Sequence, residues 1–262
     1  MWFNVKADLT YDFKLPAETM LLLEAARTPD QAIHSEILAI TPKVEIARLD
    51  DSATGERRAV FLAKGRHRIV YEATVEVLAR DAGIRGAPAV SVRDLPAEAA
   101  RYLMGSRYCQ SDRFERFVEQ EFGGLVGGDK VQAILDWIGA HFDYEAGISS
   151  ATTTAVDTFV DRAGVCRDFA HLTIALCRAA DIPARAVSCY AWKLRPADLH
   201  AVAEVYVGGR WRLVDATRKA PLDGMVRVAT GQDAADIAFM TIFGEATLVT
   251  QKFSIKRIQP PG

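Results

Sequence analysis

A cysteine at the start of an apolar segment is the residue of this sequence best placed to act as a nucleophile. The segment runs from Cys166 to Ala180, and its apolar residues recur at helical spacing around most of the circumference. Such a helix must be covered by other elements and is therefore central. At its first turn, the unpaired backbone N–H groups and the helix dipole favour a thiolate over a thiol. A buried cysteine that acts as a small hydrophobe is the alternative that position alone leaves open.

A histidine and an aspartate follow on two strand-like runs that flank Gly208 and Gly209. A two-residue turn at these glycines sets the register of a hairpin and places His200 opposite Thr217. Side chains alternate between the two faces of a sheet, and in this register His200 and Asp215 fall on the same face as diagonal neighbours. Such neighbours are about 7–8 Å apart at the backbone, within reach of their side chains.

Together the three residues fit the groups that nucleophilic catalysis needs. Cys166 would attack, His200 would take its proton as the general base, and Asp215 would hold the imidazole in the required tautomer. His171 is a competing base, but five helical steps place it about 140° around the helix axis from Cys166. We therefore expect His171 to point elsewhere.

The segments around these residues resemble the bacterial transglutaminase-like superfamily, whose members are cysteine enzymes with a papain-like core. The matching segments are GVCRDFAHL (164–172), DIPARAV (181–187) and HAVAEVYVGGRWRLVDAT (200–217). The resemblance implies a catalytic triad of Cys166, His200 and Asp215, with no cofactor and no metal.

The resemblance also predicts details of the cleft. Because the chain before the cysteine tends to line the cleft of a papain-like core, Tyr144 is a candidate oxyanion donor beside the Cys166 backbone N–H. The sequence departs from the family at Val202, where tryptophan is usual, and at Ala216, where proline is frequent. Neither residue performs bond chemistry, so these departures concern substrate fit more than catalysis.

The predicted reaction is acyl transfer through a thioester on Cys166, with a protein or peptide amide as substrate. Water as the acceptor gives a peptidase or amidase, which we favour because nothing identifies a site for a specific amine. A lysine amine as the acceptor gives a protein-crosslinking transglutaminase, and the same triad serves both. A non-catalytic interaction protein with a papain-like core is a further alternative, and so is a redox protein that uses Cys166 and Cys189.

The wider pattern predicts an α+β fold in two domains. Residues 1–100 are predicted to form an antiparallel all-β domain, with the Ala-, Gly-, Pro- and Arg-rich stretch 78–100 as its connection. Residues 101–262 are predicted to form the catalytic domain, in which a central helix packs on an antiparallel sheet and the C-terminal strands are included.

Individual elements are predicted from their periodicity. Strands are expected at 2–9, 43–49, 58–63 and 68–77, and a strand is also favoured at 20–27. Helices are expected at 111–122 and 128–142. Thr154 and Asp157 predict a capping box at the start of a short helix.

Composition excludes several classes of partner. The 262 residues are 50% hydrophobic and carry 32 basic and 34 acidic side chains, so the net charge of −2 favours no nucleic-acid partner. No apolar run of membrane-spanning length and no signal-peptide pattern is present, and we expect a cytoplasmic protein with no membrane partner. The four cysteines form no CxxC pair, which argues against a zinc ribbon and is typical of reduced cytosolic thiols. The oligomeric state is not predicted.

Overall fold

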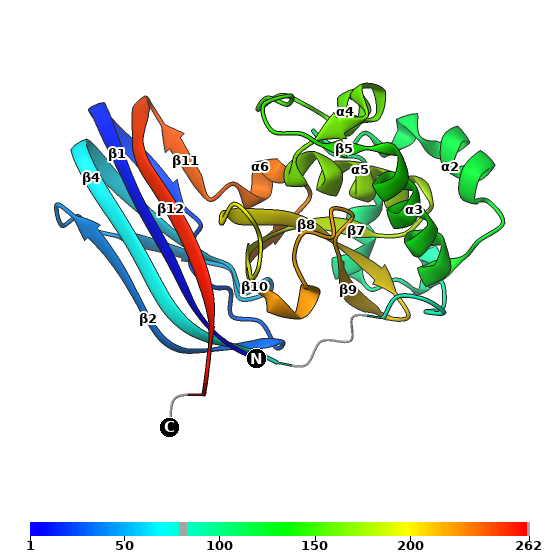
Figure 1. Ribbon diagram of the computed structural model, residues 1–262, viewed down its shortest axis with the longest axis horizontal. Helices are drawn as coiled ribbons and strands as arrows, with labels where there is room; N and C mark the ends of the chain where they lie inside the picture. The colour runs from blue at the N-terminus through cyan, green and yellow to red at the C-terminus, as the bar shows by residue number, and fades with distance from the viewer. Residues whose placement is uncertain (79–82, 261–262) are drawn as a thin grey trace.

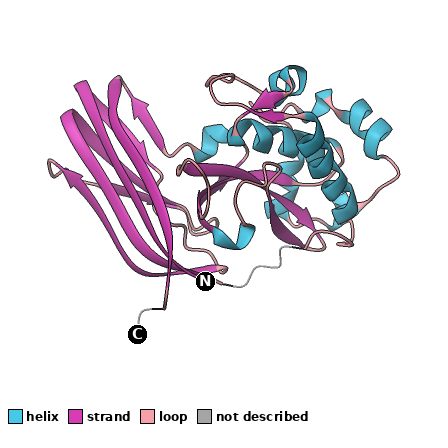
Figure 2. Ribbon diagram, in the orientation of Figure 1, coloured by secondary structure: helices cyan, strands magenta, loops and turns pink. Residues whose placement is uncertain are grey.

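Two antiparallel sheets form the framework of the protein, and each belongs to one of two units that lie side by side (Figure 1). The computed structural model describes residues 1–78 and 83–260. One unit is built of strands, whereas the other contains the helices (Figure 2). The predicted α+β class is confirmed.

The β unit is a six-stranded sheet in the order β11-β1-β4-β2, in which β12 also pairs with β1 and β3 also pairs with β4. Its strands are β1 (Trp2–Leu21), β2 (Gln31–Thr41), β3 (Ala47–Asp50), β4 (Arg57–Val77), β11 (Met240–Phe243) and β12 (Ala246–Ile258). Along β1, every second residue from Phe3 to Phe13 is buried. This period of two is the signal that made the first strand predictable.

The last two strands lie elsewhere than the sequence predicts. They were expected in the catalytic domain, but β11 pairs with residues 18–21 of β1, and β12 pairs with residues 2–13. An edge of β1 without a partner would leave a row of backbone N–H and C=O groups unpaired. The β unit therefore takes its strands from both ends of the chain.

Three local differences have simple causes. The sequence does not predict β2, because most of its residues are exposed and the strand shows no alternation. The strand favoured at 20–27 continues only to Leu21, and the next five residues are buried without regular structure. The runs 58–63 and 68–77 belong to one strand, β4, which continues through Gly65 at a φ of 74°. Of the predicted connection at 78–100, residues 79–82 lie outside the described residues.

The second unit is a four-stranded sheet in the order β10-β7-β8-β9 with helices packed against it. Its strands are β7 (Ala184–Ala191), β8 (Leu199–Val207), β9 (Arg210–Val214) and β10 (Met225–Gly231). Its helices are α1 (Ala97–Ala100), α2 (Glu115–Phe122), α3 (Gly127–His141), α4 (Ala155–Asp161), α5 (Cys166–Ala179) and α6 (Ala234–Ile237). The two-residue strands β5 (Asp143–Tyr144) and β6 (Ala163–Gly164) pair with each other, and 3₁₀ turns lie at 92–94, 101–103, 111–113 and 222–224.

Helix α5 is the central element of this unit, as predicted. All its residues from Asp168 to Arg178 are buried, and it contacts β7 and β8 as well as α2, α3 and α4. The predicted capping box also forms at the start of α4, where the Thr154 and Asp157 side chains each bond the other's backbone N–H. The described residues contain no helix long and apolar enough to cross a membrane.

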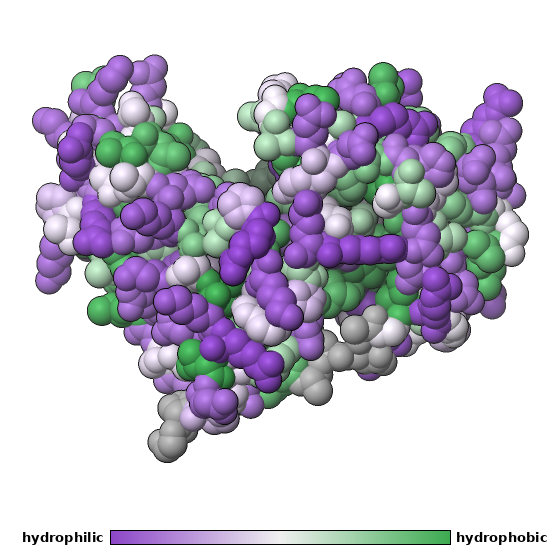
Figure 3. Space-filling model, viewed as in Figure 1, coloured by the Kyte–Doolittle hydropathy of each residue, from purple (hydrophilic) through white to green (hydrophobic). Residues whose placement is uncertain are grey.

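The two units meet over a buried interface below a hollow in the molecular surface (Figure 3). The Tyr190 hydroxyl of β7 donates to the Leu23 carbonyl at 2.9 Å, and the Ala26 N–H donates to the Arg227 carbonyl of β10 at 2.9 Å. The Arg227 guanidinium pairs with Asp30 at 2.6 Å. These contacts fix the β unit against the sheet of the second unit.

Removing one aromatic ring from this interface should weaken folding. Phe253 of β12 is 6% exposed and packs on Tyr190 at 6.3 Å and on Phe239 at 5.7 Å between ring centroids. We expect Phe253→Ala to lower the free energy of unfolding in urea by about 3 kcal/mol, because it leaves a cavity. Phe243→Ala is the control, since Phe243 is 62% exposed. Equal losses in the two variants would contradict the assigned packing.

Candidate active site

Cys166 begins α5, and the preceding turn is fixed by a buried carboxylate. Asp168 is fully buried, and its Oδ2 accepts the Val165 N–H at 2.9 Å. A Cβ added at Gly164 would lie only 2.7 Å from the Asp168 Cβ, so only glycine fits this approach. Cys166 is half-buried, whereas the other three cysteines are buried. Of the four thiols, Cys166 is the one that solvent can reach.

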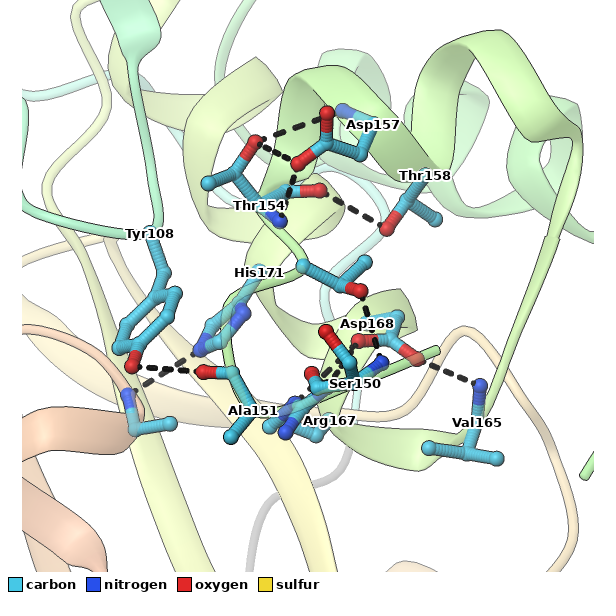
Figure 4. A network of polar contacts seen from close by, with 12 residues as sticks. Tyr108, Ser150, Ala151, Thr154, Asp157, Thr158, Val165, Arg167, Asp168 and His171 are labelled. Carbon is cyan, nitrogen blue, oxygen red and sulfur yellow. Dashed lines mark hydrogen bonds and ion pairs between the residues drawn. The ribbon is translucent and has the colours of Figure 1, made fainter. Parts of the chain in front are cut away.

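The loop before α4 is tied to the same turn (Figure 4). Arg167, the residue after the cysteine, donates from Nη2 to the Ser150 carbonyl at 2.5 Å and to Asp168 Oδ1 at 3.0 Å. The Tyr108 hydroxyl donates to the Ala151 carbonyl at 2.9 Å. These bonds hold the loop next to the start of α5.

The predicted hairpin register is confirmed. β8 and β9 pair from Val207 opposite Arg210 to Ala203 opposite Val214. Gly208 and Gly209 have φ values of 61° and 75°. Positive φ at both central residues is the conformation of a two-residue type I′ turn, whose twist matches that of the strands.

This register brings His200 and Asp215 into direct contact. Nε2 of His200 lies 2.9 Å from Oδ2 of Asp215, and the two side chains are 0% and 4% exposed. The other carboxylate oxygen, Oδ1, accepts the Thr217 N–H at 2.9 Å and the Thr217 hydroxyl at 2.7 Å. Both oxygens of Asp215 are therefore held, and the imidazole is held through Nε2.

The pair favours a charged imidazole. Burial by itself lowers the pKa of His200, but the hydrogen bonds and charges of Asp215 and Cys166 outweigh burial and raise this pKa to about 9. Among the described residues, Nδ1 of His200 is buried and makes no hydrogen bond of normal geometry. The Cys166 thiol is a neighbour of the His200 ring. The ring thus contacts the carboxylate through one nitrogen and has the other free for the thiol.

Tyr144 lies at the same place. It is the last residue of β5 and pairs with Gly164 of β6, two residues before Cys166. The pKa of Tyr144 is raised to about 12, first by burial and then by the charge of Cys166, and its hydroxyl also interacts with the Cys166 backbone N–H. The structure therefore brings together all four residues that the sequence singled out.

His171 is directed away from this cluster, as expected. It stacks on Tyr108 with the ring planes 3° apart, and its Nε2 accepts the Ala234 N–H at 3.1 Å. Burial lowers the pKa of His171 to about 4. A ring held in this way is a neutral packing group, and Figure 4 shows it beside Tyr108.

Two residues of the site were not identified from the sequence. Thr217 orients Asp215, although the predicted register had already placed it opposite His200. The Lys219 ammonium lies 4.0 Å from the ring centroid of Tyr144, and no pattern in the sequence points to this contact. Within residues 1–78 and 83–260, no group of three or more His, Cys, Asp or Glu side chains could hold a metal ion.

Comparisons with known proteins identify the family and the fold. The model of the transglutaminase-like superfamily matches residues 116–216, and that of the bacterial transglutaminase N-terminal domain matches residues 1–98. The crystal structure of a "putative cysteine protease" from Cytophaga hutchinsonii is 39% identical and has a TM-score of 0.92 over all of this chain and 92% of that one. The chain belongs to the transglutaminase-like superfamily.

A second relative matches only in part. An uncharacterized protein of Mycobacterium leprae is 30% identical over 116 residues, which are 41% of this transglutaminase-like chain. The match spans 42% of the length of that curated relative. It therefore adds a sequence likeness over part of the chain and nothing about activity.

The charge of His200 can be tested directly. By NMR titration we expect its imidazole to lose its proton near pH 9 in the wild-type protein, and at much lower pH in Asp215→Asn, where burial acts without the carboxylate. Asp12→Asn is the control, because the Asp12 side chain is 43% exposed on β1. A His200 that titrates near its ordinary value of 6.5 in the wild type would contradict the assigned pair.

The free energy of unfolding should depend on pH through the charge of the His200 imidazole. Because the pKa of His200 is raised on folding, the stabilisation is fully present below 6.5 and is lost as pH rises through about 9. The free energy of unfolding of Asp215→Asn should fall further below wild type near about pH 6 than near about pH 10. Urea unfolding at the two pH values measures both differences, and a gap that widens towards pH 10 would rule out this sign.

Proposed function

We propose that the protein is a cysteine enzyme that hydrolyses amide bonds of peptides or proteins through a thioester on Cys166. The observation that carries the proposal is the buried 2.9 Å contact between His200 and Asp215, with the second ring nitrogen left for the thiol. Membership of the transglutaminase-like superfamily supports a cysteine enzyme, and the likeness to a "putative cysteine protease" favours hydrolysis.

The first half of the reaction forms the acyl-enzyme. His200 holds the proton of Cys166, and the thiolate attacks the amide carbonyl carbon. The negative charge that develops on the carbonyl oxygen is stabilised by the Cys166 backbone N–H and the Tyr144 hydroxyl. His200 then donates its proton to the departing amine as the C–N bond breaks, which leaves a thioester on Cys166.

The second half returns the enzyme to its starting state. A water molecule attacks the thioester while His200 accepts the proton of the water, and the C–S bond breaks to release a carboxylic acid. Asp215 holds the His200 ring and stabilises the imidazolium in each half. Thr217 acts on Asp215 and not on the substrate, so it is a positioning residue.

The acceptor is the point on which crosslinking differs from hydrolysis. A lysine amine in place of water would release an isopeptide-linked product from the same thioester. Water is present at high concentration and reacts first unless a dedicated amine site excludes it. We therefore assign hydrolysis, with crosslinking as the outcome that would replace it.

A panel of peptides separates these outcomes. The protein is incubated with peptides that contain glutamine and with peptides that do not, each with and without an added lysine peptide. We expect mass spectrometry to detect hydrolysed product. Cys166→Ala should lose turnover, whereas Cys177→Ala should retain it, because the Cys177 thiol is fully buried in α5. Isopeptide product without hydrolysis would replace the assignment by transglutaminase activity. Equal turnover in the two variants would refute catalysis by Cys166, whereas no turnover of any peptide by the wild type would favour a non-catalytic interaction protein.

A further inference from the structure

A pocket of about 400 Å³ lies beside Asp215. It is lined by α3, by the end of β9 and by the segment 215–222. Leu135, Leu213 and Leu222 give it apolar walls. The same lining includes Asp215, so the pocket adjoins the residue that orients His200. A group bound here would therefore lie next to the carboxylate that holds His200.

Three cations line this pocket against a single acid. The acid is Asp215, whose two oxygens are already bonded to His200 and Thr217. Of the cations, Arg218 is paired with Asp136 of α3. The pocket therefore has an excess of positive charge that its own lining does not neutralise.

The other two cations are lysines that contact aromatic rings. The Lys193 ammonium lies 4.4 Å from the ring centroid of Trp192, and the Lys219 ammonium lies 4.0 Å from that of Tyr144. Within the described part of the chain, neither ammonium has an acidic partner. Each is an exposed donor held at a defined place by a ring.

Lys219 connects the pocket with the thiol. Its aromatic partner, Tyr144, is also the residue whose hydroxyl interacts with the Cys166 backbone N–H. The positive rim of the pocket thus extends from Asp215 towards the thiol. A carboxylate held at Lys219 would therefore lie beside the aromatic residue that adjoins Cys166.

The backbone at the rim is also unusual. Lys193 has a φ of 71° and Arg218 has a φ of 54°, a left-handed conformation that residues other than glycine rarely adopt. Strained positions of this kind gather at binding and catalytic sites because the surrounding structure must hold them there. Both residues line the same pocket, so the strain coincides with the excess charge.

We propose that this pocket, the basic subsite, binds a carboxylate of the substrate close to the amide that Cys166 attacks. The basic subsite consists of Lys193, Lys219 and Arg218 with the apolar walls described above. It rests on the proposed function and names its substrate class, which is peptides with a carboxylate near the scissile amide. A glutamate side chain or a chain-terminal carboxylate provides the required charge, and aliphatic carbons match the leucine walls.

Thiol-reactive peptides test the subsite without a known substrate. We would measure the rate at which Cys166 is labelled by three bromoacetyl dipeptides: a neutral Ala-Gln amide, an Ala-Glu amide and an Ala-Gln free acid. One or both carboxylate probes should label Cys166 about tenfold faster than the neutral probe at low probe concentration. The faster of the two identifies a side-chain or a terminal carboxylate as the preferred group.

Variants locate the preference. The double variant Lys193→Gln with Lys219→Gln should lose most of the tenfold preference, which is read as the ratio of the carboxylate-probe rate to the neutral-probe rate in that variant. Replacing both lysines by arginine should retain the preference, because the charge stays. Lys43→Gln is the matched control, since Lys43 is an exposed lysine of the β unit. A preference that is absent in wild type, or unchanged in the double glutamine variant, would overturn the basic subsite.

The same data separate the subsite from the proposed function. The preference is a ratio of two rates in one protein, so it can be read even when Cys166 reacts slowly. Slow labelling by all three probes with the tenfold ratio intact would refute an activated thiol and support the subsite. Fast labelling by all three probes at equal rates would support an activated thiol and refute the subsite.

Discussion

The contact between His200 and Asp215 is the interaction on which the rest of the site depends. A buried imidazole is driven towards its neutral form by desolvation, and the Asp215 carboxylate at hydrogen-bond distance, together with Cys166, reverses this. The carboxylate in turn needs Thr217, which binds its second oxygen. Without this chain of contacts, Cys166 would be a half-buried thiol with only the helix start to favour its thiolate.

The fold serves this contact through three elements that position one residue each. Helix α5 fixes Cys166 with a buried cap, strand β8 carries His200, and the chain leaving β9 carries Asp215. The β unit is packed against this sheet through Tyr190 and Phe253, and it also takes up the last strands of the chain. The four-stranded sheet is therefore supported on the side of the β unit by strands from both ends of the sequence.

The parts that the sequence predicted are those governed by local geometry. Two glycines with positive φ fix the hairpin register, and the register alone places His200 beside Asp215. The periodicity of α5 likewise predicts a buried helix with Cys166 at its start. Both inferences need only neighbouring residues and the dimensions of helices and strands.

The parts that the sequence did not predict depend on contacts between distant residues. Nothing near β12 shows that its partner is β1, because an exposed edge strand has a weak pattern and its pairing is set by the edge left open elsewhere. The basic subsite is similar, since Lys193 and Lys219 come to line one pocket only in the folded chain, where Lys219 contacts Tyr144 of β5. The sequence also gives no sign that the two ammonium groups contact the rings of Trp192 and Tyr144, or that the backbone at Lys193 is left-handed.

The most direct test of the central claim is the rate at which iodoacetamide alkylates Cys166 as a function of pH, in the wild type and in His200→Ala. Peptide mass mapping assigns the label to Cys166 among the four cysteines. Because His200 keeps its proton up to about pH 9, we expect rapid alkylation that persists well below about pH 8.5, the ordinary range of a thiol, and that is lost in the variant. A wild-type rate that rises only near about pH 8.5, as for an ordinary thiol, and that is the same in His200→Ala, would contradict the account.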